Sequence, residues 1–248
     1  MAKFVGVDWA GSGWFCVVLH DDGQADVDVS PSFQCVWHDH RTAERILVDI
    51  PIGLSTTGRR PCDVRAKELL APHRHTSVFW PPVRAALSAN TLSAAKALTE
   101  PHGFSLSNQA WAIVPRIREL DAFFDLTPEA VGVVRESHPE VCFAALNNGD
   151  PMAHSKHSDE GRRERLALLT RDTTGFEALY EEAVSTFIEP PAYARRLRSD
   201  GRADIIDALV LAHTANRSAQ RLGTLPSDPA IDDEPNPPRP MEIVYPAI

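Results

Sequence analysis

A short apolar run that ends on an acid, Phe4-Val5-Gly6-Val7-Asp8, constrains the fold of this chain more than any other stretch. A valine-rich run closed by the glycine turn at residues 10–13 is typical of a buried central strand. A bare carboxylate is very costly to bury, so Asp8 must be solvated, paired or bound to a metal ion. The run therefore predicts a sheet with a polar site at the end of its central strand.

The segments that follow predict an α/β fold with a mixed sheet. Residues 14–20 are a second apolar run, and residues 25–29 alternate with period two, so the first three strands are expected to be antiparallel. A weakly helical stretch at residues 33–44 leads to a strand at residues 46–49, which is apolar up to Asp49. A strand that is reached through a helical crossover lies parallel to an earlier strand.

Asp49 closes this parallel strand as Asp8 closes the first, and Pro51 marks the exit from the sheet. Neighbouring strands lie about 4.8 Å apart, and parallel strands share the edge formed by their carboxyl ends. Open α/β sheets bind ligands at that edge. We therefore expect Asp8 and Asp49 to be neighbours in a site.

The rest of the chain predicts one domain, residues 1–248, that carries a large insertion. Residues 55–130 are too long for a plain connection and are expected to be mostly helical, whereas residues 131–136 return to strand character and end on Glu136. Within the insertion, helices are expected near 63–70, 83–97 and 107–124. After it come a loop at 147–161 and helices at 162–170, 175–188 and 202–222. The chain is expected to end in a proline-rich tail over 224–248, which lies on the surface up to residue 240 and forms an edge strand at 241–246.

Charge and cysteine usage exclude several classes of protein. A net charge of −9 argues against a dedicated duplex-binding protein, although residues 55–121 carry nine Lys and Arg against five acids. The four cysteines show no C-x-x-C pair, which argues against a structural zinc site and fits reduced thiols. Without a signal-peptide pattern or a window of about 18 apolar residues, we expect a cytoplasmic protein with no membrane partner.

Convergent carboxylates indicate a metal-dependent chemistry. Asp204 and Asp207 lie three residues apart near a helix start and so share one face. Clusters of carboxylates persist where a divalent cation neutralises them, which predicts Mg²⁺ or Mn²⁺ held by Asp8, Asp49, Asp204 and Asp207. Such ions would support phosphodiester hydrolysis, with these four residues and Glu136 as the catalytic candidates. Any one of these acids alone is more often a turn former or a helix cap than a metal ligand.

Several basic residues are candidates for substrate binding. Arg59, Arg60 and Arg65, in the insertion, are able to clamp a phosphate, or else form a salt-bridged surface with nearby acids. Lys156 either meets a phosphate or is simply solvated. His138 either contacts the substrate or orients Glu136.

The order of these elements resembles the ribonuclease H-like superfamily, whose core is a mixed five-stranded sheet flanked by helices. Gly6-Val7-Asp8 and Asp204-Ile205-Ile206-Asp207 resemble the first strand and last helix of RuvC-type Holliday-junction resolvases. Nearly the whole chain is similar to an uncharacterised family of unknown function that is predicted to contain nucleases. The residues that carry this similarity are Val5-Gly6-Val7-Asp8, Val48-Asp49-Ile50-Pro51-Ile52-Gly53-Leu54, Glu136-Ser137-His138-Pro139-Glu140-Val141-Cys142-Phe143 and Met241-Glu242-Ile243-Val244-Tyr245-Pro246.

The resemblance implies a role for each acid. Asp8 would bridge the metal ions, Asp49 would be its partner, and Asp204 or Asp207 would be the ligand on the helix. Glu136 has no settled counterpart, since Asp49 holds the place of the resolvase glutamate, and it is either a ligand or a supporting residue. The implied substrate is a nucleic acid or nucleotide, single-stranded or branched rather than plain duplex.

Two other functions stay open. Asp8 followed by Gly11 and Gly13 also resembles the first phosphate loop of actin and sugar-kinase relatives, although those proteins pair two such domains around ATP. The second alternative is a non-enzymatic module that binds a partner through the basic, aromatic insertion. The oligomeric state is open, a homodimer included.

Overall fold

The computed structural model describes residues 1–171 and 175–247. Its main sheet has five strands in the order β3-β2-β1-β4-β5. The β1–β2 and β2–β3 pairs are antiparallel and the β1–β4 pair is parallel, as expected from the sequence, and β5 adds to β4 as a further parallel strand. This α/β arrangement is consistent with a ribonuclease H-like fold. The strands are β1 (Lys3–Trp9), β2 (Trp14–His20), β3 (Ala25–Ser30), β4 (Arg45–Val48) and β5 (Val134–Glu136).

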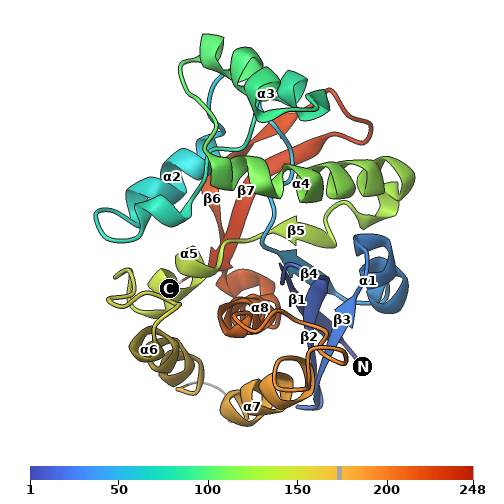
Figure 1. Ribbon diagram of the computed structural model, residues 1–248, viewed down its shortest axis with the longest axis vertical. Coiled ribbons are helices and arrows are strands. Elements are labelled where there is room, and N and C mark those ends of the chain that lie inside the picture. The colour runs from blue at the N-terminus through green and yellow to red at the C-terminus, as the bar shows by residue number, and fades with distance from the viewer. Residues whose placement is uncertain (172–174, 248) are drawn as a thin grey trace.

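Helices cover both faces of this sheet, so its central strands are buried (Figure 1). One face packs against α8 (Arg202–Ala215), which is flanked by α5 (Pro139–Leu146), α6 (Asp159–Leu169) and α7 (Phe176–Phe187). The other face packs against α1 (Phe33–His40) and α4 (Asn108–Leu126).

Gly6 allows α8 to lie directly on β1. A Cβ atom at this position would stand 2.2 Å from the backbone oxygen of Ala208 and 2.2 Å from the backbone nitrogen of Ala212. No real side chain tolerates that distance, so only glycine permits the approach. The approach places the start of α8 beside the end of β1.

The insertion and the C-terminal residues together form the upper part of the molecule in Figure 1. The insertion contains α2 (Pro61–Leu69), α3 (Leu92–Thr99) and α4, and it packs on a hairpin of β6 (Leu222–Asp232) and β7 (Arg239–Pro246). Short 3₁₀ helices complete the described chain: η1 (His75–Ser77), η2 (Arg84–Ser88), η3 (Glu100–His102), η4 (Pro128–Ala130) and η5 (Ala219–Arg221). No helix among the described residues is long and apolar enough to span a membrane.

The C-terminal region differs from expectation. The predicted surface tail at 224–240 instead forms most of β6 and the turn into β7, whose edge-strand segment is buried at Met241, Ile243 and Val244. The prolines misled the prediction because Pro226 and Pro229 fall where the β6–β7 ladder is irregular, between Leu225 and Ala230. Residue 248, the end of the predicted tail, lies outside the described residues.

The last helix is also shorter than the predicted range 202–222. It ends at Ala215, and the chain turns through η5 before β6 begins. Its fully buried run stops at that point, since Asn216 and the residues after it are exposed or half-buried up to the hairpin. The predicted insertion helix at 83–97 is likewise two elements, η2 and α3.

Candidate active site

Asp8 and Asp49 lie at the carboxyl ends of β1 and β4, as the sequence predicts. The backbone nitrogen of Asp49 donates a hydrogen bond to the carbonyl oxygen of Val7 at 3.1 Å, which fixes it beside the end of β1. Asp8 is buried, and its Oδ1 accepts a hydrogen bond from the backbone nitrogen of Trp9 at 2.7 Å. Two acids therefore share one sheet edge.

Asp204 and Asp207 reach the same edge from the first turns of α8. Asp207 is fully buried, and its Oδ2 accepts a hydrogen bond from Nζ of Lys156. Arg198 Nη2 lies 3.7 Å from Asp204 Oδ2. Within the described chain, Asp204 Oδ2 and Asp207 Oδ1 are buried without a hydrogen-bond partner. Both aspartates thus retain unused capacity to bind a cation or a donor.

The pKa values reflect this crowding of acids. Burial, followed by the charges of Asp204, Asp49 and Asp207, raises the pKa of Asp8 well above its usual range. Burial and then Asp207 raise the pKa of Asp49 to about 7 and that of Asp204 to about 6, against the opposing charge of Lys156. Such shifts show that the four carboxylates share one electrostatic environment.

Lys156 enters the cluster from the loop between α5 and α6. Burial alone would lower its pKa, but the carboxylates of Asp207 and Asp8 raise the pKa above the usual value, so the ammonium stays charged. The loop is held on two sides. Arg74 of the insertion donates to the carbonyl oxygens of Met152 at 2.8 Å and Ala153 at 2.7 Å. Glu164 of α6 accepts from the backbone nitrogen of Ala153 at 3.0 Å.

Glu136 is engaged in a buried ion-pair network with Arg60. Its Oε2 accepts from Arg60 Nη1 at 2.8 Å and from the backbone nitrogen of Ile52 at 2.6 Å, and its Oε1 accepts from Arg60 Nη2 at 2.7 Å. Arg60 also binds Asp63 through Nε at 2.9 Å and Nη2 at 2.6 Å. Both oxygens of Glu136 therefore have protein donors, in contrast to Asp204 and Asp207.

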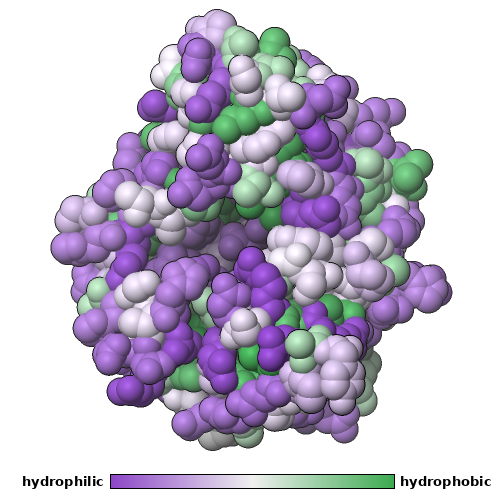
Figure 2. Space-filling view, viewed as in Figure 1, coloured by the Kyte–Doolittle hydropathy of each residue, from purple (hydrophilic) through white to green (hydrophobic). Residues whose placement is uncertain are grey.

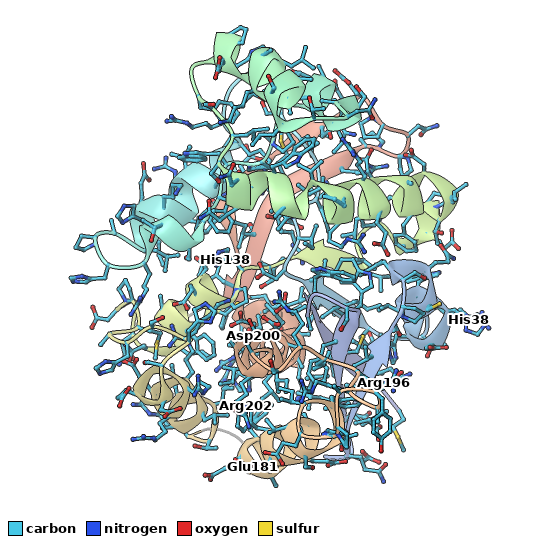
Figure 3. All side chains as sticks on the ribbon, in the orientation of Figure 1. His38, His138, Glu181, Arg196, Asp200 and Arg202 are labelled. Atoms are coloured by element: carbon cyan, nitrogen blue, oxygen red, sulfur yellow. The ribbon has the colours of Figure 1, made fainter. Side chains whose placement is uncertain are left out.

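A cavity of about 370 Å³ lies beside Asp49, between the sheet edge and the insertion. Figure 2 shows a hollow between the upper and lower parts of the molecule, and Figure 3 shows His138 in that region, near the start of α5. Lys156, His138 and Glu140 line the cavity, and burial lowers the pKa of His138. Of the four clustered carboxylates, Asp49 therefore faces the cavity directly.

The other basic candidates, Arg59 and Arg65, are exposed and do not line this cavity. The Arg59 guanidinium stacks 4.6 Å from the ring centre of Trp80, and Arg65 pairs with Glu68 at 2.8 Å. Arg60, the third arginine of this group, is buried and lines the cavity, but its guanidinium is paired with Glu136 and Asp63.

The described residues, 1–171 and 175–247, contain no group of three or more His, Cys, Asp and Glu side chains arranged to hold a metal ion as they stand. A family model described as "Protein of unknown function (DUF429)" matches residues 6–231. The chain belongs to this family. No curated protein and no solved structure matches it.

In this DUF429 protein, Glu140 belongs to the site although it was not among the site residues predicted from the sequence. It lines the cavity, is buried, and contributes to the raised pKa of Asp49 after burial and Asp207. Its Oε1 accepts a hydrogen bond from Arg165 at 2.5 Å, and its Oε2 has no partner among the described residues. The available signal was a lone acid in the otherwise apolar segment 139–146.

Replacing Asp49 with Asn is expected to stabilise the metal-free protein more as the pH rises. The folded-state pKa of about 7 lies above the ordinary value of 3.8. The folded state therefore binds more protons, and the wild type loses stability between about pH 4 and about pH 7. The uncharged Asn variant avoids this loss, which is on the order of 4 kcal/mol near pH 8.

Chemical unfolding in EDTA, near pH 5 and near pH 8, measures this difference. Asp39→Asn is the matched control, because Asp39 is exposed and its hydrogen bond with His38 lowers its pKa, so no gain with rising pH is expected there. A gain for Asp49→Asn that shrinks with rising pH would show that Lys156 outweighs burial and repulsion.

Proposed function

We propose that this protein is a metal-dependent nuclease or phosphodiesterase of the ribonuclease H-like superfamily. The observation that supports it best is the gathering of Asp8, Asp49, Asp204 and Asp207 at one sheet edge beside a cavity. Burying several carboxylates together is costly unless their charge is balanced. A protein that keeps such a cluster next to an open cavity gains from it through chemistry rather than stability.

The donor atoms fit a hard divalent cation. Carboxylate oxygens are the ligands that Mg²⁺ and Mn²⁺ prefer, and Asp204 Oδ2 and Asp207 Oδ1 accept no hydrogen bond within the described part of the chain. Asp8, Asp49, Asp204 and Asp207 would hold the ion. When bound, a divalent cation supplies an activated water and stabilises the charge of a phosphate group.

Lys156 supplies positive charge to these carboxylates, as Arg198 does to Asp204. Its ammonium pairs with Asp207, while its side chain is 30% exposed and lines the cavity. From this position it faces both the carboxylates and any phosphate that enters. We expect Lys156 to orient the phosphate by a charge-assisted hydrogen bond.

Part of the positive charge of the insertion is already paired with acids. Arg84 pairs with Asp121 at 2.8 Å, Arg116 pairs with Glu119 at 2.6 Å, and Arg60 is buried in its own network. Charges that are already neutralised release fewer counterions from DNA and add less affinity. This favours a small or single-stranded substrate over a plain duplex.

Asp8→Asn tests the proposed function. With Mg²⁺ or Mn²⁺, wild type is expected to hydrolyse single-stranded oligonucleotides, and the variant is expected to lose at least about 100-fold in rate, because one charged ligand is removed. The metal should also raise the melting temperature of wild type, since saturation at about a hundredfold excess over Kd contributes about 2.7 kcal/mol. Asp39→Asn, on the surface, should change neither quantity.

The opposite results would be equally informative. If neither ion shifts the melting temperature and no oligonucleotide is cleaved, the metal-dependent hydrolase is excluded and the non-enzymatic binding module becomes the better account. If Asp8→Asn retains full activity, the cleavage arises elsewhere or from a contaminant.

A further inference from the structure

The cavity beside Asp49 has the dimensions of a site for one nucleotide. Its volume of about 370 Å³ lies within the range of small-molecule sites and leaves no room for a base pair within a stack. Asp49 and Lys156 line one part of it, while Phe79 and Ile113 of the insertion line another. A ligand that fills it therefore touches the carboxylate edge and the insertion at once.

The insertion side of the cavity carries an aromatic ring that is open to a ligand. Phe79 is 37% exposed, one of few large apolar side chains in the described chain with that much exposure, and it lines the cavity. The neighbouring ring of Trp80 is already covered, with Lys67 Nζ 4.7 Å from its centre. An exposed ring beside a phosphate-sized polar site is the arrangement that stacks a nucleobase.

Two further residues that line the cavity, His138 and Glu140, have polar atoms without a hydrogen-bond partner in the described chain. Among the residues that the structure describes, Nδ1 of His138 and Oε2 of Glu140 are buried without partners, and the Glu140 side chain is only 6% exposed. A purely aliphatic ligand would leave these polar atoms unsatisfied, at a cost of about 1–3 kcal/mol each. A heterocycle with a polar edge suits this part of the cavity better.

We propose that the cavity takes a single unpaired nucleotide, with its base stacked on Phe79 and its phosphate beside Lys156 and Asp49. The phosphate end rests on the proposed function, whereas the base end rests on the cavity itself. The substrate class that follows is a strand end, a loop or another unpaired nucleotide, because a base inside a duplex is not available to the ring of Phe79.

Nucleoside monophosphates test this inference without turnover, because they contain no phosphodiester bond. AMP binding to the full-length protein in Mg²⁺, measured by calorimetry, is compared with binding of ribose 5-phosphate, which lacks the base. We expect AMP to bind about tenfold more tightly, because base stacking on an aromatic ring contributes about 1–3 kcal/mol.

Phe79→Ala identifies the ring that provides this difference. The variant is expected to lose about tenfold in AMP affinity and to keep its affinity for ribose 5-phosphate. Tyr193→Ala is the matched control, since Tyr193 is an aromatic residue that is 92% exposed and does not line the cavity. It should bind both ligands as wild type does.

The outcomes separate this inference from the proposed function. Equal binding of AMP and ribose 5-phosphate, or an AMP affinity that Phe79→Ala does not change, overturns the nucleotide site even if hydrolysis depends on Asp8. Binding of AMP that depends on Phe79, in a protein that cleaves no phosphodiester, supports the nucleotide site and excludes the proposed function.

Discussion

Gly6→Ala is expected to be among the most disruptive single substitutions in this protein. The added methyl would stand 2.2 Å from backbone atoms of Ala208 and Ala212, which cannot rotate away as a side chain can. Helix α8 must then move off β1. Overpacking a core typically costs 1–3 kcal/mol, and because the obstacle is backbone we expect at least about 3 kcal/mol, or roughly 10 °C in melting temperature.

Thermal and urea unfolding measure this loss, with Gly23→Ala as the control. Gly23 has a left-handed φ of 87° and no atom within 4 Å of the added carbon, so only backbone strain of about 1–2 kcal/mol is expected there. Gly6→Ala should also weaken metal-induced stabilisation, since α8 carries Asp204 and Asp207. A Gly6→Ala protein as stable as Gly23→Ala would contradict the close approach.

The second large effect is expected from Arg60→Met. The Arg60 side chain is 2% exposed and is the cation between the buried carboxylates of Glu136 and Asp63. Its Nη1 also donates to the carbonyl oxygen of Gly53 at 3.1 Å. Removing it leaves two buried acids without their charge partner, which typically costs 3–5 kcal/mol, and we expect a loss of about that size.

Arg65→Met is the matched control, because Arg65 lies in α2 and also pairs with an acid three residues away. Its pair with Glu68 has both side chains more than half exposed, at 61% and 57%, and such pairs contribute at most about 1 kcal/mol. Urea unfolding of both variants gives the comparison. Adding Glu136→Gln to Arg60→Met should restore part of the stability, and equal losses at Arg60 and Arg65 would exclude a buried network.

The pairing of β1 to β4 was predictable because these strands follow one another closely and two of them end on acids, whereas the place of β5 beside β4, after the long insertion, was not predicted. Asp8 and Asp49 each terminate an apolar run, and the crossover rule makes their strands parallel neighbours. The hairpin of β6 and β7 was not predictable in the same way. Its prolines are typical of a loop, and only the tertiary contacts with α2 and α5 show that the segment is packed.

The candidate site shows a similar division. The clustered aspartates could be predicted because a single acid in an apolar pattern stands out in the sequence. Which of several neighbouring basic residues belongs to the site depends on burial, which the sequence does not show. Arg59, Arg60 and Arg65 look equivalent in the sequence, yet Arg60 alone of these three is buried. Glu140 was overlooked because it begins a helix after Pro139, where an acid is ordinary.

The positions of the acids along the chain bear on how the protein is made. Asp8 and Asp49 belong to the first strands, but Asp204 and Asp207 come from α8, which packs on β1 only after most of the 248 residues have been synthesised. A nascent chain that has formed β1 to β5 lacks two of the four carboxylates. Nuclease activity of the proposed kind would therefore be absent from translation intermediates and would begin only when α8 docks.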